Sequence, residues 1–277
     1  MIHVKKAFVI GHPIKHSRSP LIHGTWLGQY GIAGSYEAID VSPDELPRLV
    51  DRLRDGEFVG GNVTIPHKEA VFALCDSVDP LARTIGAVNT LVRQADGRIH
   101  GFNTDYMGFL GNLDQGAPGW DAKLGRAIVL GAGGASRAIM VALRERGYDD
   151  ILILNRTEEK AVALALEIAG PFTPGGLHEF AEFAATADLV VNTTSIGMHD
   201  TRFDDLDLSL LPKTALVTDI VYVPLVTPLL ADARALGLHT VDGLGMLLHQ
   251  AVPGFEAWFG VRPEVTPELR ATIEATL

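Results

Sequence analysis

The sequence of 277 residues contains a single cysteine, Cys75. One thiol excludes an internal disulfide and is typical of a reducing compartment. Cys75 lies in an apolar stretch with helical character, so we expect it to pack in the core and not to act as a nucleophile. Long hydrophobic runs are also missing. The N-terminal segment reaches Gly11 and Pro13 too early for a signal peptide, and no stretch resembles a membrane span. We therefore expect a cytoplasmic protein.

Positive charge is scarce as well. The chain has 23 Lys and Arg residues against 34 Asp and Glu, a net charge of −11. This balance argues against nucleic-acid and membrane partners, although a local basic pocket for phosphate is compatible with it. There is no H-E-x-x-H motif, and the one pair of histidines four residues apart, His12 and His16, lies in a loop with glycine and proline. The sequence therefore predicts no metal site.

What the chain does contain is a glycine-rich turn between a strand and a helix. The apolar run 127–130 predicts a strand buried on both faces, residues 131–134 read G-A-G-G, and 135–143 continues with helix-forming residues. Such a turn aims unpaired N–H groups and the helix dipole at one spot, where a diphosphate can bind. The third glycine of the usual G-x-G-x-x-G pattern is replaced by Ser136, which is small. A dinucleotide site is predicted, with a purely structural turn as the alternative.

The end of the next predicted strand, 150–154, indicates which dinucleotide binds. An NAD site would place an acidic residue here for the ribose 2′-hydroxyl, whereas this chain has Asn155-Arg156-Thr157. A guanidinium can pair with a 2′-phosphate in bidentate geometry, so the prediction is NADP. Glu158 and Glu159 follow at once, and a solvated surface arginine is the alternative.

Strands and helices alternate along the whole chain, which predicts an α/β protein of two domains. We expect a first domain of residues 1–105 plus 243–277 and a Rossmann-like domain of residues 106–242, with the C-terminal helices returning to the first domain. Further strands are expected at 7–10, 35–41, 58–65, 88–92, 98–103, 189–192, 216–221 and 240–242.

An anion site is expected at residues 15–20, where two serines, Lys15 and Arg18 precede a helix that Pro20 can start. A carboxylate would suit this position. Ser19 as a simple N-cap is the alternative, but it would account for one hydroxyl only.

Polar residues gather at the end of the strand 58–65. Strand alternation puts Asn62 and Thr64 on one face, and we expect Lys68 in the first turn of the following helix, where a cation opposes the dipole. Such a lysine suits proton transfer. Asp105 could be its acidic partner or could cap the next helix. A surface lysine is the alternative.

Taken together, these motifs closely resemble the shikimate dehydrogenase family across essentially the whole chain. The motifs that carry the resemblance are H-S-R-S-P at 16–20, N-V-T-I-P-H-K at 62–68, G-A-V-N-T at 86–90, G-F-N-T-D at 101–105, G-A-G-G-A-S-R-A at 131–138, N-R-T at 155–157, N-T-T-S-I-G-M at 192–198, and D-G-L-G-M at 242–246 with Gln250.

The resemblance implies a reversible, NADPH-dependent reduction of 3-dehydroshikimate to shikimate, a step of chorismate and aromatic amino acid biosynthesis. It implies a small-molecule substrate held in a cleft between the domains, in a monomer or homodimer. Lys68 and Asp105 would form the catalytic pair. The implied substrate-binding residues are Ser17, Ser19, Asn62, Thr64, Asn89, Asp105, Tyr222 and Gln250. The implied cofactor-binding residues are Gly131, Ala132, Gly133, Gly134, Ala135, Asn155, Arg156, Thr157, Lys160, Ile220, Gly243 and Met246.

One position departs from the family, because Pro80, preceded by Asp79, stands where many members have an acidic residue. This puts a peripheral cofactor contact in doubt. A quinate/shikimate or aminoshikimate dehydrogenase is the nearest alternative, and Ser19 with Asn155-Arg156-Thr157 argues against it. A non-catalytic sensor of NADPH or a cyclic acid is a second alternative, which the presence of both Lys68 and Asp105 disfavours.

Overall fold

The computed structural model describes residues 4–199 and 201–277, which divide into two compact units. Unit 1 contains the chain up to Thr104 together with Leu248–Thr276, and unit 2 contains Asp105–Leu247. The predicted second division lay at the turn of Gly243. The structure instead divides within helix α9 (Leu244–Phe259), which starts in unit 2 and ends in unit 1.

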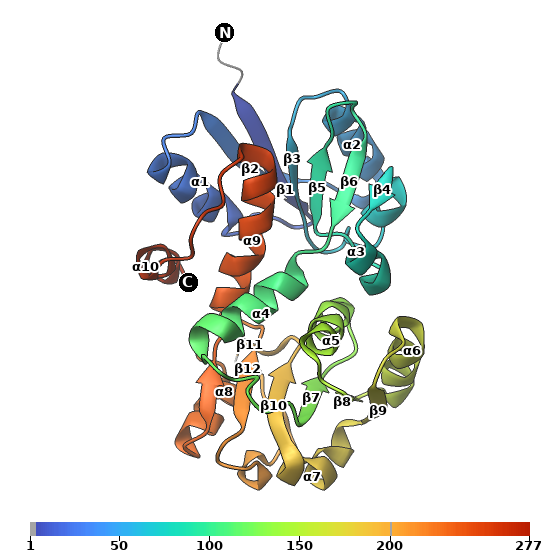
Figure 1. The fold of residues 1–277 in the computed structure, drawn as a ribbon, viewed down its shortest axis with the longest axis vertical. Coiled ribbons are helices and arrows are strands. Elements are labelled where there is room, and N and C mark those ends of the chain that lie inside the picture. The colour runs from blue at the N-terminus through green and yellow to red at the C-terminus, as the bar shows by residue number, and fades with distance from the viewer. Residues whose placement is uncertain (1–3, 200) are drawn as a thin grey trace. The chain divides into compact units, whose positions relative to one another are not determined.

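Unit 1 is built on a mixed six-stranded sheet in the order β2-β1-β3-β5-β6-β4 (Figure 1). The strands β1, β2 and β3 are parallel, and β5 runs antiparallel to both β3 and β6. Because of this reversal, the amino end of β5 lies beside the carboxyl ends of β3 and β6. The bounds are β1 (Lys5–Gly11), β2 (Gly34–Asp40), β3 (Gly60–Val63), β4 (Ser77–Val78), β5 (Thr90–Arg93) and β6 (Ile99–Phe102).

Helices cover both faces of this sheet. On one face, Leu46, Leu49, Val50 and Leu53 of α2 (Leu46–Arg54) are buried at helical spacing and join the core with Phe8 and Phe58. The other face carries α1 (Ser19–Gln29) and the unit 1 part of α9, whose aromatic side chains pack together. The remaining helical segments of the unit are η1 (Pro43–Glu45), η2 (Val71–Leu74), α3 (Pro80–Ile85) and α10 (Pro267–Glu274).

The short helix α2 has a clear local start. The Ser42 N–H and hydroxyl both donate to the Glu45 carboxylate, at 3.1 and 2.7 Å, which completes a capping box before the apolar stripe begins. The helical segment 43–54 thus begins at this capping box, with its first turn in 3₁₀ geometry.

Unit 2 has an all-parallel six-stranded sheet in the order β13-β12-β10-β7-β8-β9 (Figure 1). In chain order within the unit this is 6-5-4-1-2-3, the arrangement of dinucleotide-binding folds. The order reverses between β7 and β10. The bounds are β7 (Arg126–Leu130), β8 (Asp150–Asn155), β9 (Phe172–Gly176), β10 (Ala187–Asn192), β12 (Leu216–Asp219) and β13 (His239–Val241), and a separate strand β11 spans Ile196–His199.

The strands of this sheet are buried on both faces, since residues 127–130, 151–154 and 189–192 are all buried. Two separate apolar clusters, one around Leu152, Val190 and Leu230 and one around Phe109, Ile139 and Val191, account for the near-continuous hydrophobic runs. The helical segments are α4 (Asp105–Gly116), α5 (Gly134–Arg146), α6 (Glu158–Ile168), η3 (Leu177–Glu179), α7 (Phe180–Phe183), η4 (Ala184–Thr186), η5 (Leu208–Leu210) and α8 (Pro228–Ala235). The predicted α/β fold with a Rossmann-like unit is confirmed.

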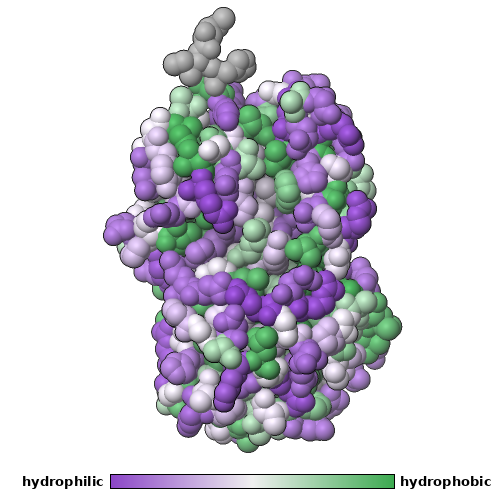
Figure 2. Space-filling view, viewed as in Figure 1, coloured by the Kyte–Doolittle hydropathy of each residue, from purple (hydrophilic) through white to green (hydrophobic). Residues whose placement is uncertain are grey.

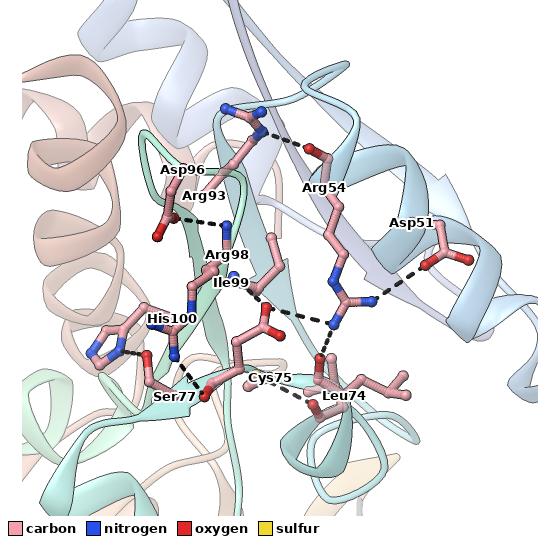
Figure 3. Close-up of polar contacts among 12 residues, drawn as sticks. Asp51, Arg54, Leu74, Cys75, Ser77, Arg93, Asp96, Arg98, Ile99 and His100 are labelled. Carbon is pink, nitrogen blue, oxygen red and sulfur yellow. Dashed lines mark hydrogen bonds and ion pairs between the residues drawn. The ribbon is translucent and has the colours of Figure 1, made fainter.

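Cys75 follows η2 directly and is half-buried (Figure 3). Its Sγ lies 3.3 Å from the Val71 carbonyl oxygen, and burial raises the pKa of the thiol to about 11. A protonated, packed thiol is a poor nucleophile. Nearby, the Arg54 guanidinium donates to the Leu74 carbonyl at 2.8 Å and thereby joins α2 to η2.

Polar and apolar residues alternate over the face of the molecule shown in Figure 2. A small apolar group lies over α6, where Val162 and Leu166 are exposed. Among the described residues, none of the helices combines the length and the hydropathy that crossing a bilayer requires.

Candidate active site

A buried polar network lies where three strand ends of unit 1 meet. Asn62 of β3 pairs across the sheet with Thr90 of β5, which pairs in turn with Phe102 of β6. The Asn89 Oδ1 atom accepts from the Thr104 N–H at 2.7 Å and from the Thr90 hydroxyl at 2.9 Å. The structure therefore brings together Asn62 and Asn89, which the sequence placed in separate motifs.

The network reaches the C-terminal part of unit 1 through Thr104. Its hydroxyl donates at 2.8 Å to the backbone carbonyl of Gln250 in α9. Thr64 follows the end of β3, and its N–H donates to the Ile10 carbonyl at 2.9 Å. Thr64 and Gln250 therefore both border the strand ends that carry Asn62 and Asn89. Four of the predicted substrate-binding residues thus belong to one region of unit 1.

Lys68 lies in a turn between β3 and η2, which corrects one expectation. It was predicted in the first turn of a helix, where a dipole would act on its charge. The helical segment that follows, η2, starts only at Val71 and is a single 3₁₀ turn, so the dipole argument does not apply. The turn is instead fixed by backbone and side-chain contacts: the Val88 N–H donates to the Lys68 carbonyl at 2.8 Å, and buried His67 Nε2 lies 2.7 Å from the Val41 carbonyl.

The predicted anion site at the start of α1 keeps its serines but loses its arginine. The Arg18 guanidinium donates to the carbonyl of Thr276, so it is engaged with the C-terminal segment. Ser19 is the first residue of α1 and makes no capping bond, and its N–H lies 3.3 Å from Ser17 Oγ. The simple N-cap alternative for Ser19 is therefore wrong.

Asp79, next to the Pro80 position that departs from the family, has a structural role. Its Oδ1 accepts from the N–H groups of Leu81 and Ala82, at 2.9 and 3.4 Å, and so caps α3, in which Pro80 is the first residue. This carboxylate is therefore occupied within unit 1.

In unit 2, the glycine-rich turn lies at the switch point of the sheet, between β7 and α5. Gly131 has φ +112°, and a Cβ there would meet Thr194 Cγ2 at 2.7 Å and Thr193 Oγ1 at 2.8 Å. Gly133 and Gly134, by contrast, have open space where a side chain would be. Only glycine permits this turn, and the open side leaves room for a diphosphate at the N-terminus of α5.

Ser136, the residue in place of the third glycine, is fully buried and stabilises the turn. Its Oγ accepts from the Gly133 N–H at 3.1 Å and lies 2.7 Å from Thr193 Oγ1, which donates to the Leu130 carbonyl at 2.7 Å. The turn, β7 and the end of β10 are therefore joined by hydroxyl groups, and the predicted cofactor-binding stretch 131–135 is held rigidly.

The predicted 2′-phosphate site lies at the end of β8. Asn155 ends the strand and its Nδ2 donates to the Thr157 carbonyl at 2.8 Å, which closes the loop before α6. Arg156 is exposed, and no carboxylate in the described part of the chain forms a salt bridge with it. Lys160 is exposed in the first turn of α6. These residues fit an NADP phosphate, because their positive charge is accessible.

A buried carboxylate, Asp219, orders the loop that carries Ile220 and Tyr222. It accepts from Asn192 Nδ2 at 2.9 Å, from the Val221 N–H at 2.9 Å and from the Thr227 hydroxyl at 2.7 Å. Burial raises the pKa of Asp219, and these three donors offset part of the rise.

Gly243 lies directly against this loop. A Cβ there would come within 2.5 Å of the Ile220 carbonyl oxygen, so only glycine allows the approach. Ile220 and Met246 both pack against the apolar cluster around Phe109. The three residues predicted to border the nicotinamide therefore all belong to this part of unit 2.

The predicted catalytic residues belong to different units. Lys68 is in unit 1, whereas Asp105 is in unit 2, where it starts α4 and is 9% exposed. Tyr222, which was predicted to bind the substrate, is also in unit 2. The described residues contain no group of three or more His, Cys, Asp or Glu side chains placed to hold a metal ion.

A groove in unit 1, lined by Ser77, Gln94, Arg98 and His100, lies at the hairpin end of β5 and β6, opposite the end that carries Asn89 (Figure 3). Its His100 Nδ1 is 2.7 Å from Ser77 Oγ.

Sequence reasoning missed three residues: Tyr36, which hydrogen-bonds Asn62, His23, which stacks on Tyr36, and Asp219, which orders the loop after β12. Tyr36 lies in the predicted strand 35–41, and alternation along it could have marked an inward-facing hydroxyl. No pattern in the sequence shows that Tyr36 bonds Asn62 or that His23 stacks on Tyr36.

Three family models match the chain. They are described as the shikimate dehydrogenase substrate binding domain, over residues 9–91, shikimate / quinate 5-dehydrogenase, over 118–246, and the shikimate 5′-dehydrogenase C-terminal domain, over 243–267.

Named relatives are similar over nearly their whole length. A shikimate dehydrogenase (NADP(+)) of Mesorhizobium japonicum is 59% identical over 99% of this chain and 97% of its own, and one of Paramagnetospirillum magneticum is 54% identical over 96% and 97%. A shikimate 5-dehydrogenase of Thermus thermophilus, solved with NADP(H) and shikimate, is 40% identical with a TM-score of 0.86 over 99% of both chains. A quinate dehydrogenase of Corynebacterium glutamicum, solved with NAD, is 36% identical with a TM-score of 0.89 over 99% of both chains.

These matches agree with the structure. The model over residues 9–91 covers most of the buried polar network of unit 1, and the model over 118–246 covers the parallel sheet and the glycine turn of unit 2. The chain belongs to the shikimate dehydrogenase family.

Proposed function

We propose that this protein catalyses the reversible, NADPH-dependent reduction of 3-dehydroshikimate to shikimate, a step of chorismate and aromatic amino acid biosynthesis. The observation that carries the proposal is the full-length similarity, at 52–59% identity, to relatives named shikimate dehydrogenase (NADP(+)). The similarity extends over both units and is not confined to isolated motifs.

NADP is the cofactor we infer for unit 2. The diphosphate would lie on the open side of residues 131–135, where Gly133 and Gly134 leave space at the N-terminus of α5. Arg156, with Asn155, Thr157 and Lys160 beside it, would bind the 2′-phosphate through charge-assisted hydrogen bonds. Bound NADPH supplies the hydride of the reaction. Ile220, Gly243 and Met246 would border its nicotinamide ring.

We assign the substrate to the polar residues of unit 1. Ser17 and Ser19, at the start of α1, would bind the substrate carboxylate with their hydroxyl groups. The ring hydroxyls would contact Asn62, Thr64, Asn89 and Gln250, with Asp105 and Tyr222 contributed by unit 2. The buried hydrogen bonds of Asn62 and Asn89 hold their amides in fixed directions, as selective binding requires.

Lys68 is the acid and base in this proposal, with Asp105 as its partner. Reduction of a ketone builds negative charge on its oxygen, and the ammonium of Lys68 would stabilise that charge and donate the proton. In the reverse direction the neutral amine would take the proton from the substrate hydroxyl. The carboxylate of Asp105 would hold the ammonium in place.

The protein is proposed to act in the cytoplasm, as a monomer or a homodimer. The single cysteine suits a reducing compartment. Gel filtration with light scattering would measure the number of chains.

A quinate dehydrogenase is the second candidate, because a protein of that name has a TM-score of 0.89 with this chain. The two functions are separated by steady-state assays with shikimate and quinate, each with NADP⁺ and NAD⁺. We expect the highest kcat/KM for shikimate with NADP⁺. A higher value for quinate with NAD⁺ would reject the proposal in favour of the alternative.

A further inference from the structure

A second layer of residues lies behind Asn62, and it starts with Tyr36. This residue is in the middle of β2, paired with Ala7 of β1, and its side chain is 9% exposed. The Tyr36 hydroxyl donates to Asn62 Oδ1 at 2.6 Å. Tyr36 and Asn62 are far apart in the sequence. Their side chains meet because β2 and β3 both lie next to β1 in the sheet.

The Asn62 side chain uses most of its hydrogen-bonding capacity inside the protein. An amide has two N–H donors and a carbonyl oxygen that accepts twice. The Asn62 Nδ2 group donates to the Asn89 carbonyl at 3.2 Å and to Thr90 Oγ1 at 3.1 Å, so both donors are used. The Asn62 oxygen accepts from Tyr36 and lies near the His23 imidazole, so at most one acceptor position is left on that oxygen.

The orientation of the amide follows from its neighbours. The Asn89 backbone carbonyl can only accept, so the nitrogen of Asn62 has to face it and the oxygen has to face Tyr36. The opposite orientation would set two carbonyl oxygens against each other.

His23 supports Tyr36 from the side. The imidazole stacks on the phenol ring with centroids 3.9 Å apart and an interplanar angle of 13°, and Phe255 stacks on the imidazole at 5.9 Å. His23 is fully buried and neither ring nitrogen has a hydrogen-bond partner. Burial lowers the pKa of His23 to about 3 and raises the pKa of Tyr36. The imidazole of His23 is therefore neutral near pH 7, and the Tyr36 hydroxyl keeps its proton.

We propose that Tyr36 is a positioning residue that makes Asn62 an acceptor only. The group that a ligand presents to Asn62 then has to be a hydrogen-bond donor, a hydroxyl, and a ketone or ether oxygen at that position is rejected because two acceptors would meet. The inference deepens the proposed function and rests on it, since it assigns a selectivity to the substrate site of unit 1.

The first test is Tyr36→Phe, which keeps the ring and removes the hydroxyl. We expect kcat/KM for shikimate to fall about ten-fold or more, because the buried Asn62 oxygen loses a partner and its position is no longer fixed. The KM for NADP⁺ should stay within about two-fold, since Tyr36 lies in unit 1 and contacts none of the proposed cofactor residues. A purely structural role would lower the melting temperature without separating the two KM values.

Tyr148→Phe is the matched control. Tyr148 of unit 2 is also buried, at 2% exposure, but its hydroxyl has no hydrogen-bond partner. Removal of this hydroxyl should leave both KM values as in the wild type. If Tyr36→Phe behaves like Tyr148→Phe, the inference is wrong.

A second measurement starts with the wild type and uses substrate analogues. Fluorine is close to a hydroxyl in size but cannot donate, so wild-type protein is assayed with shikimate analogues that carry fluorine in place of each non-reacting hydroxyl in turn. At least one analogue should lose about ten-fold or more in kcat/KM, and the penalty of Tyr36→Phe should shrink for that analogue alone. Equal activity on all analogues would refute the acceptor assignment, whereas a wild type inactive on shikimate itself would refute the proposed function.

Discussion

The unfolding free energy of this protein should fall as the pH drops below 6.5, because His23 cannot take up a proton in the folded state. The imidazole is fully buried, stacked between Tyr36 and Phe255, and without hydrogen bonds to either ring nitrogen. Burial lowers its pKa from 6.5 to about 3, and the nearby Asn62 side chain offsets only part of this effect.

The sign and size of the effect follow from proton linkage. Between pH 6.5 and 3 the unfolded chain binds a proton at His23 that the folded chain does not. The stability contributed by the neutral imidazole is therefore complete above pH 6.5 and is lost as the pH falls, by ~1.4 kcal/mol for each pH unit. The loss is ~2 kcal/mol at pH 5 and reaches ~5 kcal/mol near pH 3.

The assay is urea unfolding of the wild type and of His23→Leu at pH 7.5 and pH 5. The difference in unfolding free energy between the two proteins is then compared at the two pH values. The wild type should lose ~2 kcal/mol more than the variant on acidification, because leucine has no proton to gain. His178→Gln, which removes an exposed histidine, controls for the loss of a basic group. If the curves of the wild type and His23→Leu run parallel, His23 titrates in the folded protein and the argument from burial is refuted.

Four further substitutions test the two proposed sites and their framework. Lys68→Ala should lower kcat by roughly three orders of magnitude with a much smaller change in KM, as measured by steady-state kinetics, and a small effect on kcat would remove this lysine from the mechanism. Arg156→Ala should weaken NADPH by roughly ten-fold or more in fluorescence titration and leave NADH nearly unchanged, so equal losses would show that it does not bind the 2′-phosphate. Gly131→Ala should destabilise unit 2 by about 1–3 kcal/mol in urea unfolding, because its Cβ would lie 2.7 Å from Thr194 at a φ of +112°, and unchanged stability would contradict the crowding. Asp219→Asn should cost about 1–3 kcal/mol, because an NH2 group would replace one carboxylate oxygen and face at least one of the three donors, and full stability would mean that the loop has other supports.

The sequence alone determined those features that are local in the chain. The strand at 127–130, the glycine turn and the helix after it follow from an apolar run, three glycines and good helix formers, and each reappears within a few residues of its predicted bounds. The family, the NADP preference and the α/β class depend on such contiguous motifs, so they could be read without coordinates.

The tertiary structure decided what depends on contacts between distant segments. Lys68 stands in a backbone-fixed turn before a 3₁₀ segment, because hydrogen bonds from Val88 and His67 override the helical pattern. Arg18 is bound by the carbonyl of Thr276, at the other end of the chain. The direction of the Asn62 amide is set by Tyr36 and by the Asn89 carbonyl across the sheet. Hydrogen bonds of this kind depend on strand order and register, which arise only when the whole sheet is assembled.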